Sequence, residues 1–106
     1  MHLTVTDEHG SLVASVATES TFDMAPDGSA FAHVIGHFEP GAGFARIRAM
    51  LDRFDEAYVT GNLERAFVVH EEIDRLGLRA TDADGNVYAV FNVYFQQDAM
   101  LFAACS

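Results

Sequence analysis

Apolar and polar residues alternate along the first third of the chain with the two-residue period of β-strands. The alternation predicts strands at Leu3–Thr6, Leu12–Thr18 and Ala30–Phe38. Asp7-Glu8-His9-Gly10 and Pro26-Asp27-Gly28 supply turn chemistry between them, and Phe22 and Met24 form a short extension or an irregular crossing. We therefore expect an antiparallel meander.

The expected strand from Ala30 to Phe38 has two distinct faces. Side chains of a strand point alternately to opposite sides. One face carries Phe31, His33, Ile35 and His37, and the other carries Ala32, Val34, Gly36 and Phe38.

The middle third changes to the three- and four-residue spacing of amphipathic helices. The first predicted stripe is formed by Phe44, Ile47, Leu51, Phe54 and Tyr58. Gly61 fits the residue after a helix end, and Asn62 fits the N-cap of a second helix that ends at Gly77. The second helix is expected to bury Leu63, Ala66, Phe67, His70 and Ile73. A helical hairpin follows, with one kinked helix as the alternative.

The last third returns to strand patterns. Three strands are predicted, a short one at Arg79–Thr81 and longer ones at Val87–Phe95 and Ala99–Ala104. The first two are separated by Asp82–Asn86, a sequence typical of a hairpin turn, and the last two by the turn Gln96-Gln97-Asp98. The predicted fold class is α+β, a single domain over residues 1–106, with an antiparallel sheet in the order βββ-αα-βββ packed on the helical hairpin.

The two last predicted strands, Val87–Phe95 and Ala99–Ala104, are apolar on both faces, which suggests a self-association surface. Val87, Ala89, Phe91, Val93 and Phe95 fall on one face, and Tyr88, Val90 and Tyr94 on the other. A helical hairpin covers one face of a sheet, so a curled sheet, a pocket or a second subunit must cover the other. Symmetric dimers are the commonest soluble oligomers, so we favour a homodimer formed partly through the sheet.

Charge narrows the range of partners. The formal net charge is −10, and the six basic residues are all arginine. Nucleic acids and anionic membranes are disfavoured as partners, whereas a basic protein would be attracted. Ordinary solubility also accounts for such a charge.

The cysteine content and the apolar runs suggest a soluble protein of the cytoplasm. Cys105 is the single cysteine, so no internal disulfide is possible and a reducing compartment fits. No apolar run approaches the roughly 20 residues of a membrane helix, and Met1–Gly10 lacks the features of a secretory signal.

Histidines are the first candidates for a ligand or catalytic site. His33 and His37 share a strand face at roughly 13 Å between Cα atoms, too far to share a metal unless a bulge at Gly36 bends the strand. His70 has Asp74 one helical turn away, a pairing that can orient an imidazole as a general base or satisfy a structural histidine. The segment His70–Asp74 lacks the second histidine of the zincin motif, and no metal site is predicted.

Gly41 and Gly43 are the last candidates. They precede a helix, where open backbone N–H groups bind anions, but Arg46 stands where a dinucleotide fingerprint needs Gly or Ala. Cys105 has no evident activating cation, and Asp82, Asp84 and Asn86 lack the remainder of a calcium loop.

Taken together, the patterns favour a non-enzymatic, acidic protein-interaction module, homodimeric and without a cofactor. One version is an inhibitor of a basic protein, which requires an exposed acidic face formed by Asp52, Asp55, Glu56, Glu71 and Glu72. The alternative is a small-molecule-binding protein or a modest enzyme, which requires His33, His37 and His70 to converge on one pocket.

Overall fold

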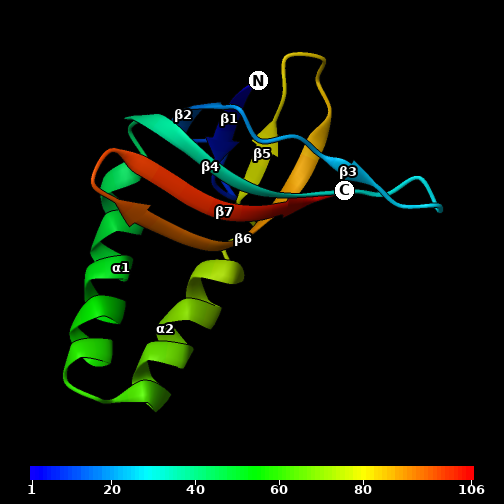
Figure 1. The fold of residues 1–106 in the computed structure, drawn as a ribbon. Coiled ribbons are helices and arrows are strands. Elements are labelled where there is room, and N and C mark those ends of the chain that lie inside the picture. Colours follow the sequence, from blue (N-terminus) through cyan, green and yellow to red (C-terminus); the bar gives the residue numbers. More distant parts are fainter.

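The computed structural model describes residues 1–106 and contains seven strands and two helices (Figure 1). The strands are β1 (His2–Thr6), β2 (Leu12–Thr18), β3 (Asp23–Met24), β4 (Ala30–Pro40), β5 (Arg79–Thr81), β6 (Val87–Gln96) and β7 (Ala99–Cys105). The helices are α1 (Phe44–Val59) and α2 (Leu63–Asp74). The predicted α+β class, with an antiparallel sheet and a helical hairpin, is confirmed.

The sheet closes on itself into a barrel. Its strand order is β2-β1-β5-β6-β7-β4-β3, every neighbouring pair is antiparallel, and an additional pairing of β2 with β4 joins the two sides. Closure removes the exposed edges of β2 and β4 along the paired residues. It also gives the sheet an inner face that the helices alone could not cover.

The inner face is filled by the apolar half of each alternating strand. In β4, Ala32, Val34 and Gly36 are buried while Phe31, His33, Ile35 and His37 are exposed, so the predicted faces are confirmed. The main contributors from the other strands are Leu3, Val5, Val16, Val90, Met100 and Phe102.

The predicted faces of β6 are correct only up to Phe91. Asn92 has a φ of 55°, and the pairing with β7 shifts between Phe91 and Tyr94. This β-bulge adds one residue to the strand and inverts the alternation. Val93 and Phe95 are consequently buried with Tyr88 and Val90, whereas Tyr94 faces outward, contrary to the prediction.

Gly36 is required where β2 crosses closely over β4. A Cβ at this position would lie 2.5 Å from the backbone oxygen of Ala17 and 2.6 Å from Cγ1 of Val16. The register of β4 continues without a shift against both β2 and β7. Gly36 therefore marks the barrel closure, not the bulge considered from the sequence.

The helical hairpin packs on the barrel with one half and extends away from it with the other (Figure 1). Ile47 and Leu51 of α1 and Ile73 of α2 join the barrel core. At the connection, Gly61 has a φ of 78° and the Asn62 side chain accepts a hydrogen bond from the backbone N–H of Arg65, as the capping pattern predicts. Neither helix is long and apolar enough to cross a membrane.

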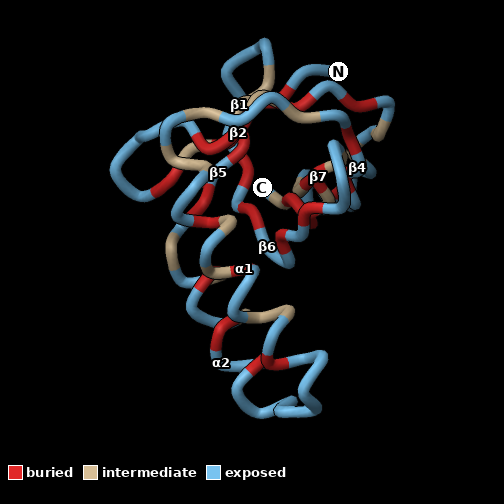
Figure 2. The backbone as a smooth tube through the Cα atoms, turned by 90° about the vertical axis from the view of Figure 1, so that its left-hand side faces the viewer, coloured by how far each residue is buried: buried red, intermediate tan, exposed pale blue.

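The predicted burial of the second helix is wrong at its beginning. Leu63 and Phe67 are 51% and 66% exposed, whereas Ala66, Val69 and Ile73 are buried. The reason is that α2 packs against α1 and the barrel with the side that carries Ala66, Val69 and Ile73. Leu63 and Phe67 lie on a different side of the helix, in the half that extends beyond the barrel. Figure 2 shows this far half as almost entirely exposed.

Candidate functional site

The strongest candidate site is the outer surface of β4, β7 and β6, which we call the outer sheet face. We define it by the outward-pointing residues Phe31, His33, Ile35, His37, Leu101, Ala103, Cys105, Ala89, Phe91 and Tyr94. Ile35 is 61% exposed, and Phe31, Phe91 and Tyr94 are each more than one third exposed. Several large apolar side chains on adjacent strands therefore lie open to water.

The outer sheet face carries no Asp, Glu, Lys or Arg, although the chain has a net charge of −10. Two carboxylates contact the border of this face. Oδ2 of Asp98, in the β6–β7 turn, lies 3.3 Å from Nδ1 of His37, and Oδ1 of Asp55, on α1, lies 3.3 Å from the Tyr94 hydroxyl. An uncharged apolar face on a strongly charged molecule is the type of surface that a protein partner covers.

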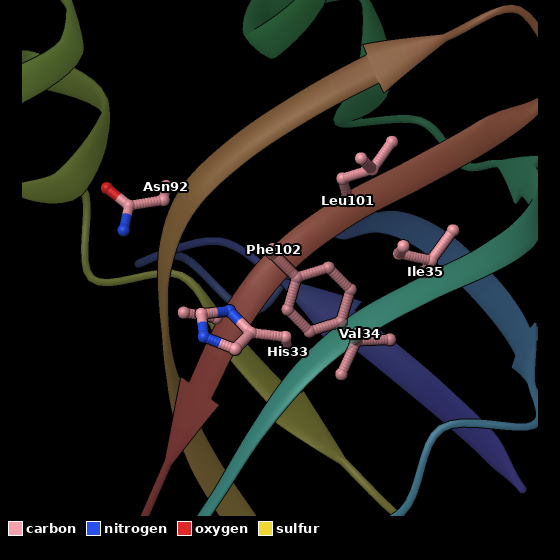
Figure 3. Close-up of a pocket in the computed structure, with 7 residues that line it drawn as sticks. His33, Val34, Ile35, Asn92, Leu101 and Phe102 are labelled. Atoms are coloured by element: carbon pink, nitrogen blue, oxygen red, sulfur yellow. The ribbon is translucent and has the colours of Figure 1, made fainter.

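A hollow of about 190 Å³ opens on this face beside the β-bulge (Figure 3). Its lining is formed by His33, Val34, Ile35, Asn92, Leu101, Phe102 and Ala103. The extra residue of the bulge separates Phe91 from Tyr94 opposite Ala103 and Leu101, which leaves the space. The hollow is predominantly apolar, with His33 and Asn92 as its polar residues.

The three candidate histidines do not converge. His33 lines the hollow and packs edge-on against Phe31 at 4.9 Å between ring centres, while His37 lies against Asp98. His70 is on α2, with its Nδ1 3.7 Å from Oδ2 of Asp74. No three residues of the types His, Cys, Asp and Glu are grouped to hold a metal ion.

Asp74, the partner of His70, joins the hairpin to the β-bulge of β6. The Asp74 carboxylate accepts a hydrogen bond from the backbone N–H of Asn92 at 3.1 Å, so it supports the bulge. The imidazole of His70 is partly exposed and lies 5.9 Å from the ring of Phe54. The prediction that this histidine lies on the inner face of the helix is thus only partly met, because His70 lies at the edge of that face.

A second link between the sheet and the helices is made by Tyr94. Its hydroxyl donates to Oδ1 of Asp55 at 3.3 Å. The negative charge of Asp55 raises the pKa of the Tyr94 phenol, and burial and the hydrogen bond add to this effect. The outer face of β6 is thereby joined to one side of the hairpin.

A second exposed apolar surface lies on that same side of the hairpin. We call it the hairpin patch, formed by Tyr58, Val59, Leu63 and Phe67, all at least half exposed. Tyr58 and Val59 follow Asp55 by one helical turn, and Phe67 and Leu63 precede Asp74 by two and three turns. Residues at such spacings share one helix face, so the hairpin patch continues the helix faces whose Asp55 and Asp74 contact β6.

Gly41 and Gly43 have no backbone N–H group free for an anion. The N–H of Gly41 donates to the carbonyl of Val13, and that of Gly43 donates to the carbonyl of Leu12. These bonds fasten the start of α1 to β2. The local role of both glycines is therefore structural.

Acidic residues of the helices are interleaved with arginines. Arg48 lies within 4.0 Å of Asp52 and Asp55, Arg53 of Glu72, and Arg75 of Glu71. Among the five acidic residues required by the inhibitor version, Glu56 is the one without such a pair. The helices do not present a uniformly acidic face.

The remaining candidates have local explanations. Asp82 accepts hydrogen bonds from the backbone of Asp84 and Asn86, from the Asn86 amide and from the Tyr88 hydroxyl, so it stabilises the β5–β6 turn. Cys105 is half-buried on the outer sheet face. Neither belongs to a cluster of reactive groups.

The fold and the site define an antiparallel β-barrel with a projecting helical hairpin and an uncharged apolar face. Comparisons with protein-family models, with curated proteins and with solved structures gave no match. The function is therefore argued from the geometry of this chain.

Proposed function

We propose that the protein is a non-enzymatic interaction module that acts as a homodimer and associates through its outer sheet face. The observation that carries the proposal is the contrast between this face and the whole molecule: several exposed apolar side chains and no charged residue, on a chain of net charge −10. Burying such a face removes apolar area from water, which is the main driving force of association.

Charge favours a second copy as the occupant. Two copies of a chain with net charge −10 repel each other when their acidic surfaces meet, and like charges opposed across an interface are unfavourable. The outer sheet face carries charge only at its border, where Asp23, Asp55 and Asp98 lie, so two copies can approach there at a lower electrostatic cost. A closed two-fold dimer would bury the outer sheet face once on each subunit, so this face would not be available for further growth.

The acidic surface of the dimer supports a further, basic protein partner. Asp27, Asp82 and Asp84 lie in strand-connecting turns and have no arginine partner. Charge of this kind increases the rate of encounter with a positively charged protein. The single cysteine favours a reducing compartment, so the cytoplasm is the proposed location.

Native mass spectrometry and sedimentation of the purified protein test this proposal. We expect a species of twice the chain mass of 11.6 kDa. Ile35→Arg, at the exposed centre of the face, is expected to weaken the dimer at least about 30-fold, since removal of a central interface residue costs about 2 kcal/mol. Ile35 points outward, so the far-ultraviolet circular dichroism should not change.

Met24→Arg is the matched control. Met24 is exposed on β3, but it pairs with the inward-facing Ala30 and so points to the opposite side of the sheet from the outer sheet face, and the substitution adds the same charge. This variant is expected to remain dimeric. A wild-type protein that stays monomeric at high micromolar concentration would refute the proposal, and a monomer that retains a small molecule would instead favour ligand binding in the hollow near His33.

A further inference from the structure

We infer that the homodimer is reciprocal: the hairpin patch of each copy packs on the outer sheet face of the other. This inference rests on the proposed function and specifies its interface. It follows from the size of the two surfaces, from their charge and from their common orientation.

The outer sheet face is too small to hold a stable dimer alone. Three strands about 4.8 Å apart and seven residues long, at about 3.3 Å per residue, give a flat footprint of about 300 Å². Two such faces in contact bury about 600 Å², whereas stable interfaces bury at least about 1,200 Å² in total. A sheet-on-sheet dimer therefore needs additional contact area.

The hairpin patch supplies this area. The far half of two adjacent helices, each about 10 Å wide and about 12 Å long over eight residues, has a footprint of about 250 Å². The two footprints are similar in size, so one can cover the other. If each copy contributes both, the total approaches about 1,100 Å², close to the lower limit of stable interfaces.

Both surfaces lie on one side of the molecule, as a two-fold dimer requires. The contacts of Asn92 with Asp74 and of Tyr94 with Asp55 hold the outer face of β6 beside that side of the hairpin. The sheet and the far half of the hairpin lie at opposite ends of the molecule, whose longest extent is 41 Å (Figure 1). A two-fold axis in the interface, perpendicular to this direction, places each hairpin over the partner's sheet.

Charge selects this arrangement over one in which hairpin faces hairpin and sheet faces sheet. The hairpin patch is bordered by Asp55 and Glu71, which pair with Arg48 and Arg75, and by Glu64, which has no arginine partner. Two hairpins in contact would bring the two Glu64 carboxylates together. The outer sheet face has no charged residue of its own, and the carboxylates at its border, those of Asp23, Asp55 and Asp98, lie beside Phe31, Tyr94 and His37, away from its centre at Ile35 and Leu101. Hairpin-on-sheet packing is thus the arrangement that buries both apolar surfaces.

Phe67 is the residue best placed to anchor the contact. It is 66% exposed on a helix, and an aromatic ring is large and apolar enough to cover the open, predominantly apolar hollow of about 190 Å³ beside the bulge. Aromatic side chains that fill pockets near the centre of an interface contribute a large part of its affinity. The structure assigns Phe67 as the knob and the hollow around His33, Ile35 and Leu101 as its receptor.

Two variants of opposite charge test the pairing. Phe67→Glu and Ile35→Arg are each expected to weaken self-association at least about 30-fold in sedimentation, the factor that corresponds to the loss of a central interface residue. When the two variants are mixed, one contact of the reciprocal dimer is wild-type, and the other brings the introduced carboxylate against the introduced guanidinium. The mixture is therefore expected to recover a heterodimer, seen by native mass spectrometry at the sum of the two variant masses.

Val68→Glu is the control for the hairpin. Val68 is adjacent to Phe67 and half exposed, but it lies about 100° further around the helix, and we expect this variant to stay dimeric. Unchanged circular dichroism of the variants excludes misfolding as the cause of dissociation.

The outcomes separate this inference from the proposed function. If Ile35→Arg dissociates the dimer and Phe67→Glu does not, the outer sheet face is the interface but the hairpin is not its partner, and the inference is overturned. If both variants dissociate and the mixture does not recover, the two patches do not meet each other, which also overturns it. A monomeric wild-type protein overturns both proposals.

Discussion

The substitution Gly36→Ala is a direct test of the barrel closure. Gly36 pairs with Thr18 where β2 crosses β4, and an added Cβ would lie 2.5 Å from the Ala17 carbonyl oxygen. Ordinary contacts between such atoms are about 3.5 Å or longer. The obstructing atom belongs to a hydrogen-bonded strand, so relief requires that β2 move away from β4.

The cost is expected near the upper end of the range for overpacked cores, about 3 kcal/mol. Shifts of about 4–8 °C per kcal/mol apply to domains of similar size, so the melting temperature should fall by roughly 10–20 °C. Urea unfolding followed by circular dichroism gives the free energy of unfolding for comparison. The pairing of β2 with β4 should be weakened first, since the atoms that the added methyl group would meet belong to Val16, Ala17 and Thr18 of β2.

Gly43→Ala is the matched control for this measurement. Gly43 has a φ of −85°, and an added Cβ would meet its nearest atom, the Leu12 carbonyl oxygen, at 3.3 Å. Its effect should remain within about 1 kcal/mol, the usual range for a cap position. Equal stability of the two variants would mean that β2 does not cross closely over Gly36, and the closed barrel would be refuted.

Two further predictions concern the bulge and the dependence of stability on pH. Asn92→Val should cost about 1–2 kcal/mol because a β-branched residue resists positive φ, whereas Asn92→Gly should be close to neutral; equal urea midpoints would contradict the strained bulge. The side-chain hydrogen bond from Asn86 is the main cause that holds the pKa of Asp82 below its ordinary value of 3.8. The ionised Asp82 carboxylate therefore stabilises the fold above pH 3.8, and this contribution is lost as the pH falls through the lowered pKa. Burial and Asp82 raise the pKa of Tyr88 above 10.0, and the charge of Asp55 raises the pKa of Tyr94 above the same value. The two neutral phenols therefore stabilise the fold below pH 10, and this contribution is lost as the pH rises through the raised pKa values. Thermal melts across pH should give a plateau between these limits, and Asp82→Asn should flatten the acid side; a maximum of stability below about pH 3 would contradict this account.

The local elements follow from short-range pattern and turn chemistry. The alternation in β4, the Asp82–Asn86 turn and the capping residues Gly61 and Asn62 all act within a few positions of the chain, and the structure confirms them. Such features depend on backbone conformations that a few neighbouring residues determine.

The face of β6 could not be followed beyond Asn92 from alternation alone. A single inserted residue inverts every later side chain, and the insertion is stabilised by Asp74, a residue 18 positions away. One signal was present: asparagine is depleted in strands and tolerates positive φ, so its place among Val, Tyr and Phe marks an irregularity.

The burial of the helical side chains likewise could not be predicted from the helical period alone. The helical period correctly predicts that Ile47, Leu51 and Ile73 are buried. It also predicts burial for Leu63 and Phe67, which lie beyond the barrel and are exposed. Periodicity gives the side of a helix that is apolar; it does not give the length of the surface that is available to cover it.

The sequence by itself determined the α+β class, the order of strands and helices, the turns and the acidic charge, because each depends on local conformation or on composition. The tertiary structure decided three further features: the closure of the sheet at Gly36, the hollow beside Asn92 and the shared orientation of the two exposed apolar surfaces. These depend on contacts between residues far apart in the chain, where a glycine or an asparagine acquires its role from the strand or helix that the fold places beside it.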